Sequence, residues 1–192
     1  MQLELLKDDL ETIESLLTFG VLQDVKGELL NRKNGVVYCA CSDGDQFHDR
    51  YCRQSLFQME QRADHPRIHP LTLNGGPLLC HPKSPLVNVN STLAYDYYEM
   101  LFASTNMKET WSIILEGHAP CAAARKIGLS LFAQLDIQMY VSVMARHRGD
   151  LENIDIVDHF HLSYGCARKR THFINPEKWN EWLPHYGKKL VA

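Results

Sequence analysis

The chain has 192 residues, of which 45% are hydrophobic and 22% are charged, and this balance predicts a single globular domain, 1–192, with a full core. Its 20 Lys and Arg residues against 23 Asp and Glu residues give a net charge of −3, which argues against nucleic acid or a membrane surface as a partner. The apolar runs are far shorter than the roughly 20 residues of a membrane span, and the acidic start lacks a signal-peptide layout, so we expect a cytoplasmic protein.

The start of the chain predicts a helix followed by a buried strand. Apolar residues recur at helical spacing over Leu3–Leu17, charged residues occupy the rest of the helix surface, and Gly20 stands where the helix would end. We therefore expect an amphipathic helical arm within 1–30. The apolar run Gly35–Cys41 follows an Asn-Gly turn signal and predicts a strand buried on both faces.

A second helix is predicted over 46–61, and an irregular stretch follows it. The residues from 64 to 85 are rich in proline and histidine. They contain a short predicted strand near Leu71 and a turn at Asn74-Gly75-Gly76.

The middle of the chain predicts a crossover from one buried strand to another. Ser91 is a suitable N-cap for a helix through Leu93 to Leu101, and Trp111–Leu115 is an apolar strand. We expect Gly117–Cys121 to break this strand and to open an alanine-rich helix, with Pro120 in its first turn.

The remaining pattern completes an α/β fold. A helix is predicted over Leu135–Arg148 with a stop at Gly149, a late strand over Ile154–Leu162, and then a polar turn region before a Trp-containing end. Strands that alternate with helices predict a mainly parallel β-sheet flanked by helices. Ligands in such sheets bind beyond the carboxyl ends of the strands.

Cysteine and histidine side chains follow two of these strands. The chain has six cysteines, no Cys-x-x-Cys pair and ten histidines, which favours thiols or metal ligands over a disulfide framework. Cys41 ends one strand, and His118 and Cys121 come after another, where three-residue spacing at a helix start would place them on one face. Two sulfurs and one imidazole favour zinc. The alternative for each residue is an ordinary buried thiol or core histidine, and Cys39, one pleat behind Cys41, is expected in the core.

The order of four motifs resembles the β-class carbonic anhydrases. The motifs are Cys41-Ser42-Asp43 at a strand end, Asn74-Gly75-Gly76 in the next loop, Ser91-Thr92-Leu93-Ala94-Tyr95 at a helix start, and Glu116-Gly117-His118-Ala119-Pro120-Cys121. The resemblance covers about 35–165. It implies that Cys41, His118 and Cys121 bind Zn²⁺, and that zinc-bound hydroxide hydrates carbon dioxide reversibly to bicarbonate. It also implies that the N-terminal helix contributes to a homodimer or a dimer of dimers.

Two positions depart from that family's pattern. The resemblance implies that Asp43 accepts a hydrogen bond from zinc-bound water while an arginine holds it off the metal, but Asp45 stands at the arginine position. Asp43 could then become a fourth ligand and close the site. Leu73, before Asn74, also stands where the family has an arginine. Arg50, Arg53 and Arg67 are the candidates to replace the missing guanidinium.

Three functions are therefore open at this point. The first is a zinc lyase of the carbonate dehydratase type, and the second is a non-catalytic zinc-binding protein with a closed Cys2His-Asp site. The third is a hydrolase of a related small electrophile, with an entrance reshaped by the segment His65-Pro66-Arg67-Ile68-His69. The two histidines of that segment are either proton shuttles or solvated loop residues.

Overall fold

A computed structural model describes residues 3–25, 35–44, 46–61, 67–82, 84–87, 92–148, 153–165 and 168–190. Within these ranges six strands form one sheet in the order β1-β6-β5-β4-β2-β3. The strands are β1 Leu22–Asp24, β2 Val36–Cys41, β3 Ile68–Leu73, β4 Ser112–Ala119, β5 Asp155–Ser163 and β6 Lys169–Ile174. The strand order places β2 and β4 side by side, with the edge strand β3 next to β2.

The central strands of the sheet are parallel, as predicted. β3, β2, β4 and β5 pair in parallel, whereas β6 pairs antiparallel with β5, and β1 pairs antiparallel with β6. The sequence interpretation missed these last two strands. β1 has three residues, and β6 begins with Lys169 and Arg170, which resembled a polar turn.

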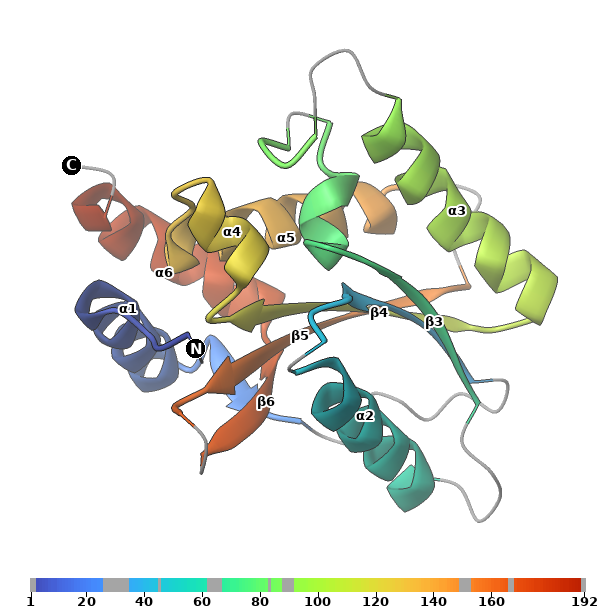
Figure 1. Cartoon of the computed structure of the whole chain (residues 1–192), viewed down its shortest axis with the longest axis horizontal. Helices are drawn as coiled ribbons and strands as arrows, with labels where there is room; N and C mark the ends of the chain where they lie inside the picture. The colour runs from blue at the N-terminus through green and yellow to red at the C-terminus, as the bar shows by residue number, and fades with distance from the viewer. Residues whose placement is uncertain are drawn as a thin grey trace.

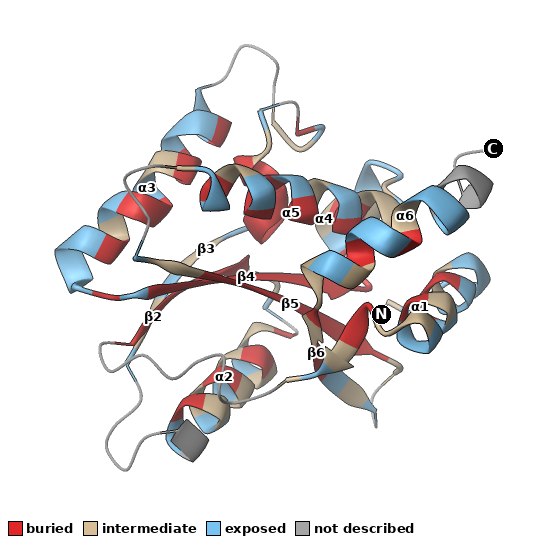
Figure 2. Cartoon of the chain, turned by 180° about the vertical axis from the view of Figure 1, so that it is seen from behind, coloured by how far each residue is buried: buried red, intermediate tan, exposed pale blue. Residues whose placement is uncertain are grey.

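Helices cover both faces of this sheet (Figure 1). They are α1 Lys7–Phe19, α2 Phe47–Gln61, α3 Leu93–Lys108, α4 Ala122–Lys126, α5 Leu131–Arg146 and α6 Pro176–Leu190, with a short 3₁₀ helix η2 at Gly76–Cys80. α3, α4 and α5 lie on one side of the sheet, and α2 lies on the other (Figures 1 and 2). None of the helices in the described ranges is both long and apolar enough to cross a membrane.

The core fills the space on both faces of β2. All six residues of this strand are buried (Figure 2). Cys39 packs into the cluster with Tyr97 and Leu101 of α3, whereas Tyr38 and Ala40 face the α2 side. The prediction of a strand buried on both faces is therefore confirmed.

The N-terminal helix packs onto its own chain. α1 ends at Gly20, whose φ of 80° gives the left-handed C-cap that glycine adopts without strain. Ile13 and Leu16 are buried in a cluster with Trp182 of α6, and the Trp182 Nε1–H donates a hydrogen bond to Ser15 Oγ at 2.9 Å. The predicted amphipathic helix is thus confirmed, while 26–30 of the predicted arm lie outside the described residues.

Two predicted helix boundaries differ from the structure. α5 begins at Leu131, four residues before the predicted start, because Ser130 Oγ caps it by accepting a hydrogen bond from the Ala133 N–H at 3.2 Å. Its helical residues end at Arg146, and Gly149 lies outside the described residues. Thr92 occupies the N-cap position of α3, and Ser91, the predicted cap, also lies outside them.

The predicted break in β4 is wrong. Gly117, His118 and Ala119 continue the strand and pair with residues 160–162 of β5. Pro120 precedes α4 rather than standing in its first turn, and Cys121 is the N-cap of that helix. Pairing with β5 therefore extends the strand beyond the glycine that suggested its end, whereas pairing with β2 stops at Glu116.

Candidate metal site

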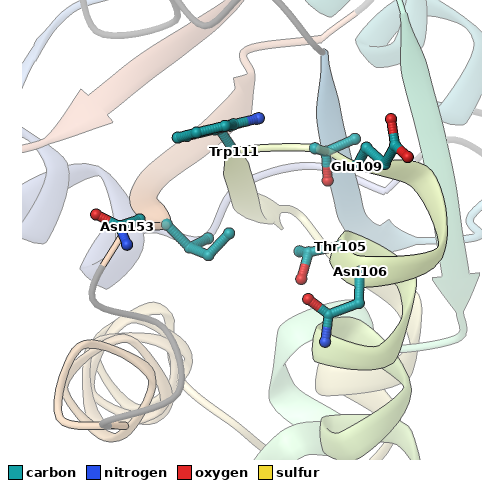
Figure 3. Close-up of a pocket in the computed structure, with 7 residues that line it drawn as sticks. Thr105, Asn106, Glu109, Trp111 and Asn153 are labelled. Atoms are coloured by element: carbon teal, nitrogen blue, oxygen red, sulfur yellow. The ribbon is translucent and has the colours of Figure 1, made fainter.

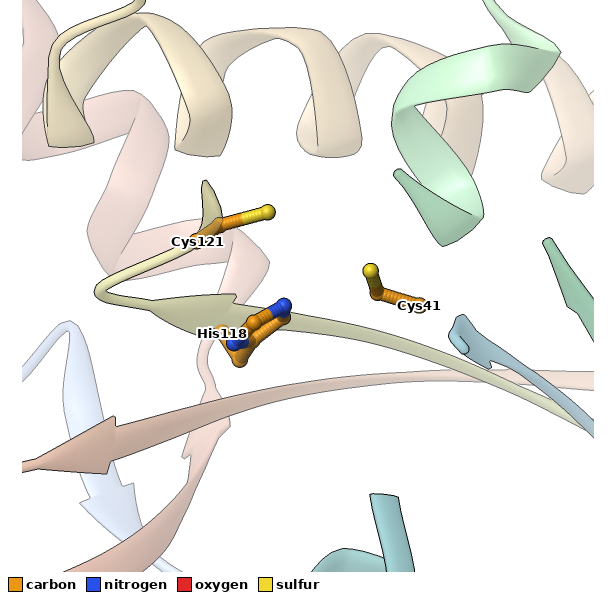
Figure 4. A group of neighbouring side chains, drawn as sticks. All are labelled: Cys41, His118 and Cys121. Carbon is orange, nitrogen blue, oxygen red and sulfur yellow. The ribbon is translucent and has the colours of Figure 1, made fainter. Parts of the chain in front are cut away.

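Cys41, His118 and Cys121 meet at the carboxyl edge of the sheet. Cys41 is the last residue of β2, His118 lies near the end of the adjacent parallel strand β4, and Cys121 follows β4. One ligand atom from each of the three lies within 4.8 Å of the other two. Figure 4 shows the two sulfurs and the imidazole facing a common space. We call these three residues the metal group.

The reason for this proximity differs from the one predicted. His118 lies on a strand, and Cys121 lies beyond the strand end, so no shared helix face brings them together. The backbone turn at Pro120 instead returns Cys121 toward the end of β2. The expected proximity of Cys41, on the neighbouring strand, to His118 and Cys121 is observed.

The two thiols of the metal group lie in apolar surroundings. Cys41 and Cys121 are buried with Leu78 and Ala124, and partly buried Leu86, Ala123, Leu129 and Ile137 pack against this cluster. The Gly75 N–H donates a hydrogen bond to Cys41 Sγ at 3.2 Å. The backbone donor favours the thiolate form of Cys41, whereas the apolar surroundings of both sulfurs disfavour it.

The predicted Asn74-Gly75-Gly76 turn packs closely against the backbone of Cys41. Gly75 and Gly76 have φ values of 102° and 53°, in the left-handed region. A Cβ atom at Gly76 would lie 2.5 Å from the backbone nitrogen of Cys41. Ser42 Oγ also donates a hydrogen bond to Asn74 Oδ1 at 2.9 Å, which joins the loops after β2 and β3. Glycine is thus required where the turn touches the strand end.

The two thiols have opposite shifts in acidity. The hydrogen bond from Cys121 lowers the pKa of Cys41 to about 3, against burial, and contacts with His118 and the Gly75 N–H lower it further. The same hydrogen bond raises the pKa of Cys121, and burial adds to that increase. The Cys121 thiol is therefore the hydrogen-bond donor and Cys41 the acceptor. A metal cation between the two sulfurs would replace the shared proton.

His118 is available as a nitrogen ligand. It is buried, and neither of its ring nitrogens has a hydrogen-bond partner among the described residues. Buried imidazoles ordinarily have such partners. Two neighbouring thiols and a buried imidazole match the Cys2His donor set of known zinc sites.

Asp43 lies at the rim of the metal group. Its Oδ2 atom is 4.0 Å from His118 Nε2, and its side chain is 15% exposed. The carboxylate is thus within reach of the same space as the three candidate ligands. Asp45, the residue that departs from the family pattern, lies outside the described residues.

The three candidate arginines occupy different places. Arg50 is fully buried beneath the metal group, and its Nη2 donates a hydrogen bond to the carbonyl oxygen of Cys41 at 2.5 Å. Arg53 lies 3.4 Å from Asp49, one turn away on α2. Arg67 donates to the Lys108 carbonyl oxygen at 3.3 Å, at the opposite edge of the sheet. Arg50 is the member of this trio that contacts the metal group, through the backbone of Cys41.

Other predicted residues lie away from the metal group. Cys39 is in the core, with its Sγ 3.5 Å from the Tyr97 hydroxyl oxygen. Leu73 ends β3 and is exposed. His69 lies on β3, where burial lowers its pKa, and His65 lies outside the described residues.

A cavity of about 260 Å³ reaches Cys121 from the surface. Its lining includes Pro120 and Arg125 next to Cys121, and Asp8 and Asp9 at the start of α1. A second cavity, of about 450 Å³, lies between the end of α3 and the residues preceding β4 and β5, including Trp111 (Figure 3). It contains no member of the metal group, because it lies at the amino ends of the strands.

Sequence reasoning missed a row of polar residues that begins directly before α2 and continues along it. Gln46, Arg50, Gln54 and Gln58 recur every four residues, and all four are buried against the sheet. The spacing was visible in the sequence. It predicts one shared helix face, but a polar face is ordinarily a solvated one.

No family model and no curated protein matches the sequence. Among solved structures, the chain is similar to carbonic anhydrase from Streptococcus mutans, with 13% identity, a TM-score of 0.45, and coverage of 91% of this chain and 100% of that chain. It is also similar to the β-carbonic anhydrase CafD of Aspergillus fumigatus, with 11% identity, a TM-score of 0.43, and coverage of 80% and 99%. An apo carbon disulfide hydrolase gives 12% identity, a TM-score of 0.35, and coverage of 81% and 84%.

The structural likeness is to β-carbonic anhydrases. Because these TM-scores lie below 0.5, we base the function on the side chains of the metal group and not on the likeness.

The glycine turn beneath Cys41 yields a test of the site. Replacing Gly76 with alanine places a Cβ 2.5 Å from backbone, in addition to the roughly 1–3 kcal/mol that an unfavourable backbone conformation costs. We expect a lower free energy of unfolding, measured by urea denaturation. Gly44→Ala is the matched control, because a Cβ there meets nothing within 4 Å. Equal stabilities of the two variants would contradict the close approach.

Proposed function

We propose that the protein binds one Zn²⁺ ion through Cys41, His118 and Cys121 and catalyses the reversible hydration of carbon dioxide to bicarbonate. The observation that carries the proposal is the gathering of the three ligand atoms within 4.8 Å. The resemblance of the motifs to β-class carbonic anhydrases gives the reaction. A cytoplasmic location and a single domain over 1–192 remain sequence-based parts of this proposal.

The surrounding residues suit that chemistry. Zinc, when bound, supplies the Lewis acidity that makes hydroxide available from water near neutral pH. The Gly75 N–H and the apolar cluster around Cys41 and Cys121 hold the sulfurs in a low-dielectric pocket, which admits an uncharged molecule such as carbon dioxide at low desolvation cost. In this proposal Asp43 accepts the hydrogen bond that orients the attacking water.

Metal content tests the site directly. We expect about one zinc per chain in freshly purified protein, and a sharp loss in the variants Cys41→Ser, His118→Ala and Cys121→Ser, because each removes one of the three ligands. Elemental analysis by mass spectrometry measures the occupancy. Cys52→Ser is the matched control, since Cys52 is an exposed thiol on α2. Wild-type protein without metal, or full occupancy in the ligand variants, would refute the zinc proposal.

A closed, non-catalytic zinc site is the second candidate. It is favoured by the position of Asp43, whose Oδ2 lies 4.0 Å from His118 Nε2 at the rim of the metal group. A carboxylate there would compete with water for the fourth coordination position of the metal. A tetrahedral site filled by four protein ligands holds no nucleophile.

The residue at position 45 separates the two candidates. In the closed form, carbon dioxide hydration near pH 7 is slow, and Asp45→Arg would raise it by giving Asp43 a bidentate partner that draws it from the metal. We expect a gain of about tenfold, the factor given by a charge-assisted hydrogen bond worth roughly 1.5 kcal/mol.

Stopped-flow hydration assays measure this rate. Asp45→Asn is the matched control, because it removes the negative charge without adding a guanidinium group. Fast wild-type hydration at pH 7 would exclude the closed site. An Asp45→Arg variant that keeps its zinc and gains no activity would show that position 45 does not govern Asp43.

The exposed side of α1 leads to a prediction about assembly. Leu6, Leu10 and Leu17 are 59%, 45% and 41% exposed, although Ile13 and Leu16 are buried in the same chain. We propose that this side forms the interface of a homodimer or a dimer of dimers. Sedimentation velocity at micromolar concentration should show an oligomer that Leu10→Glu weakens. Leu56→Glu, at an exposed position on α2, should leave it intact; a monomeric wild type would contradict the proposal.

A further inference from the structure

The buried face of α2 is polar where it meets the sheet. Gln46, Arg50, Gln54 and Gln58 follow one another at four-residue steps, and Gln46 is 6% exposed while the other three are fully buried. Amide and guanidinium groups are costly to bury unless they find hydrogen-bond partners. Apolar residues at these positions would bury the same face without that cost. The partners of these side chains therefore indicate what the polar face does.

Three of these side chains reach backbone or side-chain groups beside the metal group. Gln46 Nε2 donates to the carbonyl oxygen of Pro120 at 3.1 Å, next to Cys121. Arg50 Nη2 donates to the carbonyl oxygen of Cys41 at 2.5 Å. Gln54 Nε2 donates to Glu116 Oε2 at 2.6 Å, and Glu116 lies two residues before His118. Gln46, directly before α2, and two residues of α2 thus contact the chain at or beside each of the three candidate ligands.

Glu116 connects these contacts into one network. Its side chain is fully buried, the Tyr38 hydroxyl donates to Oε1 at 2.6 Å, and Arg50 Nη1 lies 3.6 Å from the same oxygen. Alternate residues of a strand point to one face, so Glu116 and His118 share the face of β4 that α2 covers. The guanidinium of Arg50 consequently links the end of β2, which carries Cys41, to the strand that carries His118.

The contacts are concentrated at the end of α2 nearest the metal group. Gln58 continues the same row and is equally buried, but neither polar atom of its amide has a hydrogen-bond partner among the described residues. Burial of a glutamine on this face therefore does not by itself produce the contacts. They occur where the helix passes the ends of β2 and β4.

We propose that Gln46, Arg50 and Gln54 are positioning residues, which set the spacing of Cys41, His118 and Cys121 through these contacts without binding the metal. This inference rests on the proposed zinc function and adds to it the structural element that organises the site. It accounts for the presence of a buried charge and two buried amides where α2 meets the sheet. In this role the row holds the end of β2 at a fixed distance from the end of β4 and the residues that follow it.

The test compares nearly isosteric variants of the row. Gln46→Met removes the donor to Pro120 and keeps the shape of the side chain. Arg50→Met combined with Glu116→Gln removes the ion pair without leaving a buried charge unpaired, which protects folding. Gln58→Met is the matched control, since it changes an equally buried residue of the same helix. Circular dichroism and thermal unfolding establish that each variant is folded.

Zinc affinity by chelator competition and the absorption spectrum of the Co²⁺-substituted protein are the readouts. We expect the first two variants to bind zinc about 10–100-fold more weakly, the loss typical of residues that orient metal ligands, with altered cobalt bands. Gln58→Met should match the wild type in both. Unchanged affinity and spectra in all variants, or an equal loss in Gln58→Met, would overturn the positioning role.

A metal-free measurement separates this inference from the proposed function. Diamide oxidises two thiols to a disulfide and is itself reduced to the hydrazine, so the rate of Cys41–Cys121 cross-linking in metal-free protein reports the proximity of the two sulfurs. Peptide mass spectrometry identifies that pair. We expect slower cross-linking in Gln46→Met and in the double variant than in Gln58→Met. If the rates differ as expected but the wild type binds no zinc, the zinc function alone is refuted. Equal cross-linking rates would refute the positioning role.

Discussion

The buried charge of Arg50 constrains both the fold and the candidate site. A guanidinium without solvent is stable only beside groups that replace its hydration, and here these are the carboxylate of Glu116 and the carbonyl oxygen of Cys41. Loss of one partner from a buried ion pair costs roughly 3–5 kcal/mol. The position of α2 on the sheet and the relative positions of β2 and β4 therefore depend on the same interaction.

The metal group lies where two unlike halves of the molecule meet. On the α2 side of the sheet, Glu116, His159 and Gln54 form a polar layer, whereas Leu78 and Ala124 surround the sulfurs in an apolar cluster. The imidazole comes from the strand face that carries the polar layer, and the sulfurs belong to the apolar cluster. The nitrogen donor and the sulfur donors thus meet at one edge of the sheet, although they come from different parts of the core.

Much of this arrangement could be predicted from the sequence, for reasons that lie in strand geometry. The apolar run ending at Cys41 identified β2, and neighbouring parallel strands end at the same edge, so the convergence of Cys41 with His118 and Cys121 followed. The break expected at Gly117 was wrong because pairing with β5 overrides the local preference of glycine.

The positions of α2's polar contacts could not be predicted, because they depend on tertiary packing. A row of glutamines and arginine at four-residue spacing has the pattern of a solvated helix face. The difference lies in Glu116 and in carbonyl groups at the ends of β2 and β4, which approach α2 only in the folded chain. The sequence interpretation missed β1 and β6 for a similar reason, since β6 is defined by its pairing with β5 and β1 by its pairing with β6 rather than by their composition.

On the opposite face of β4, the side chains of α5 and β5 pack closely against the strand that carries His118. Gly117 leaves room for Gln138 of α5, whose Nε2 donates to the carbonyl oxygens of Leu115 and His159 on two adjacent strands, at 3.0 and 3.1 Å. A Cβ at position 117 would lie 2.4 Å from Gln138 Oε1 and 2.7 Å from the Phe160 ring. A side chain at position 117 would therefore displace both the amide that bridges β4 and β5 and a core aromatic ring, so shortening Gln138 alone would not make room for it.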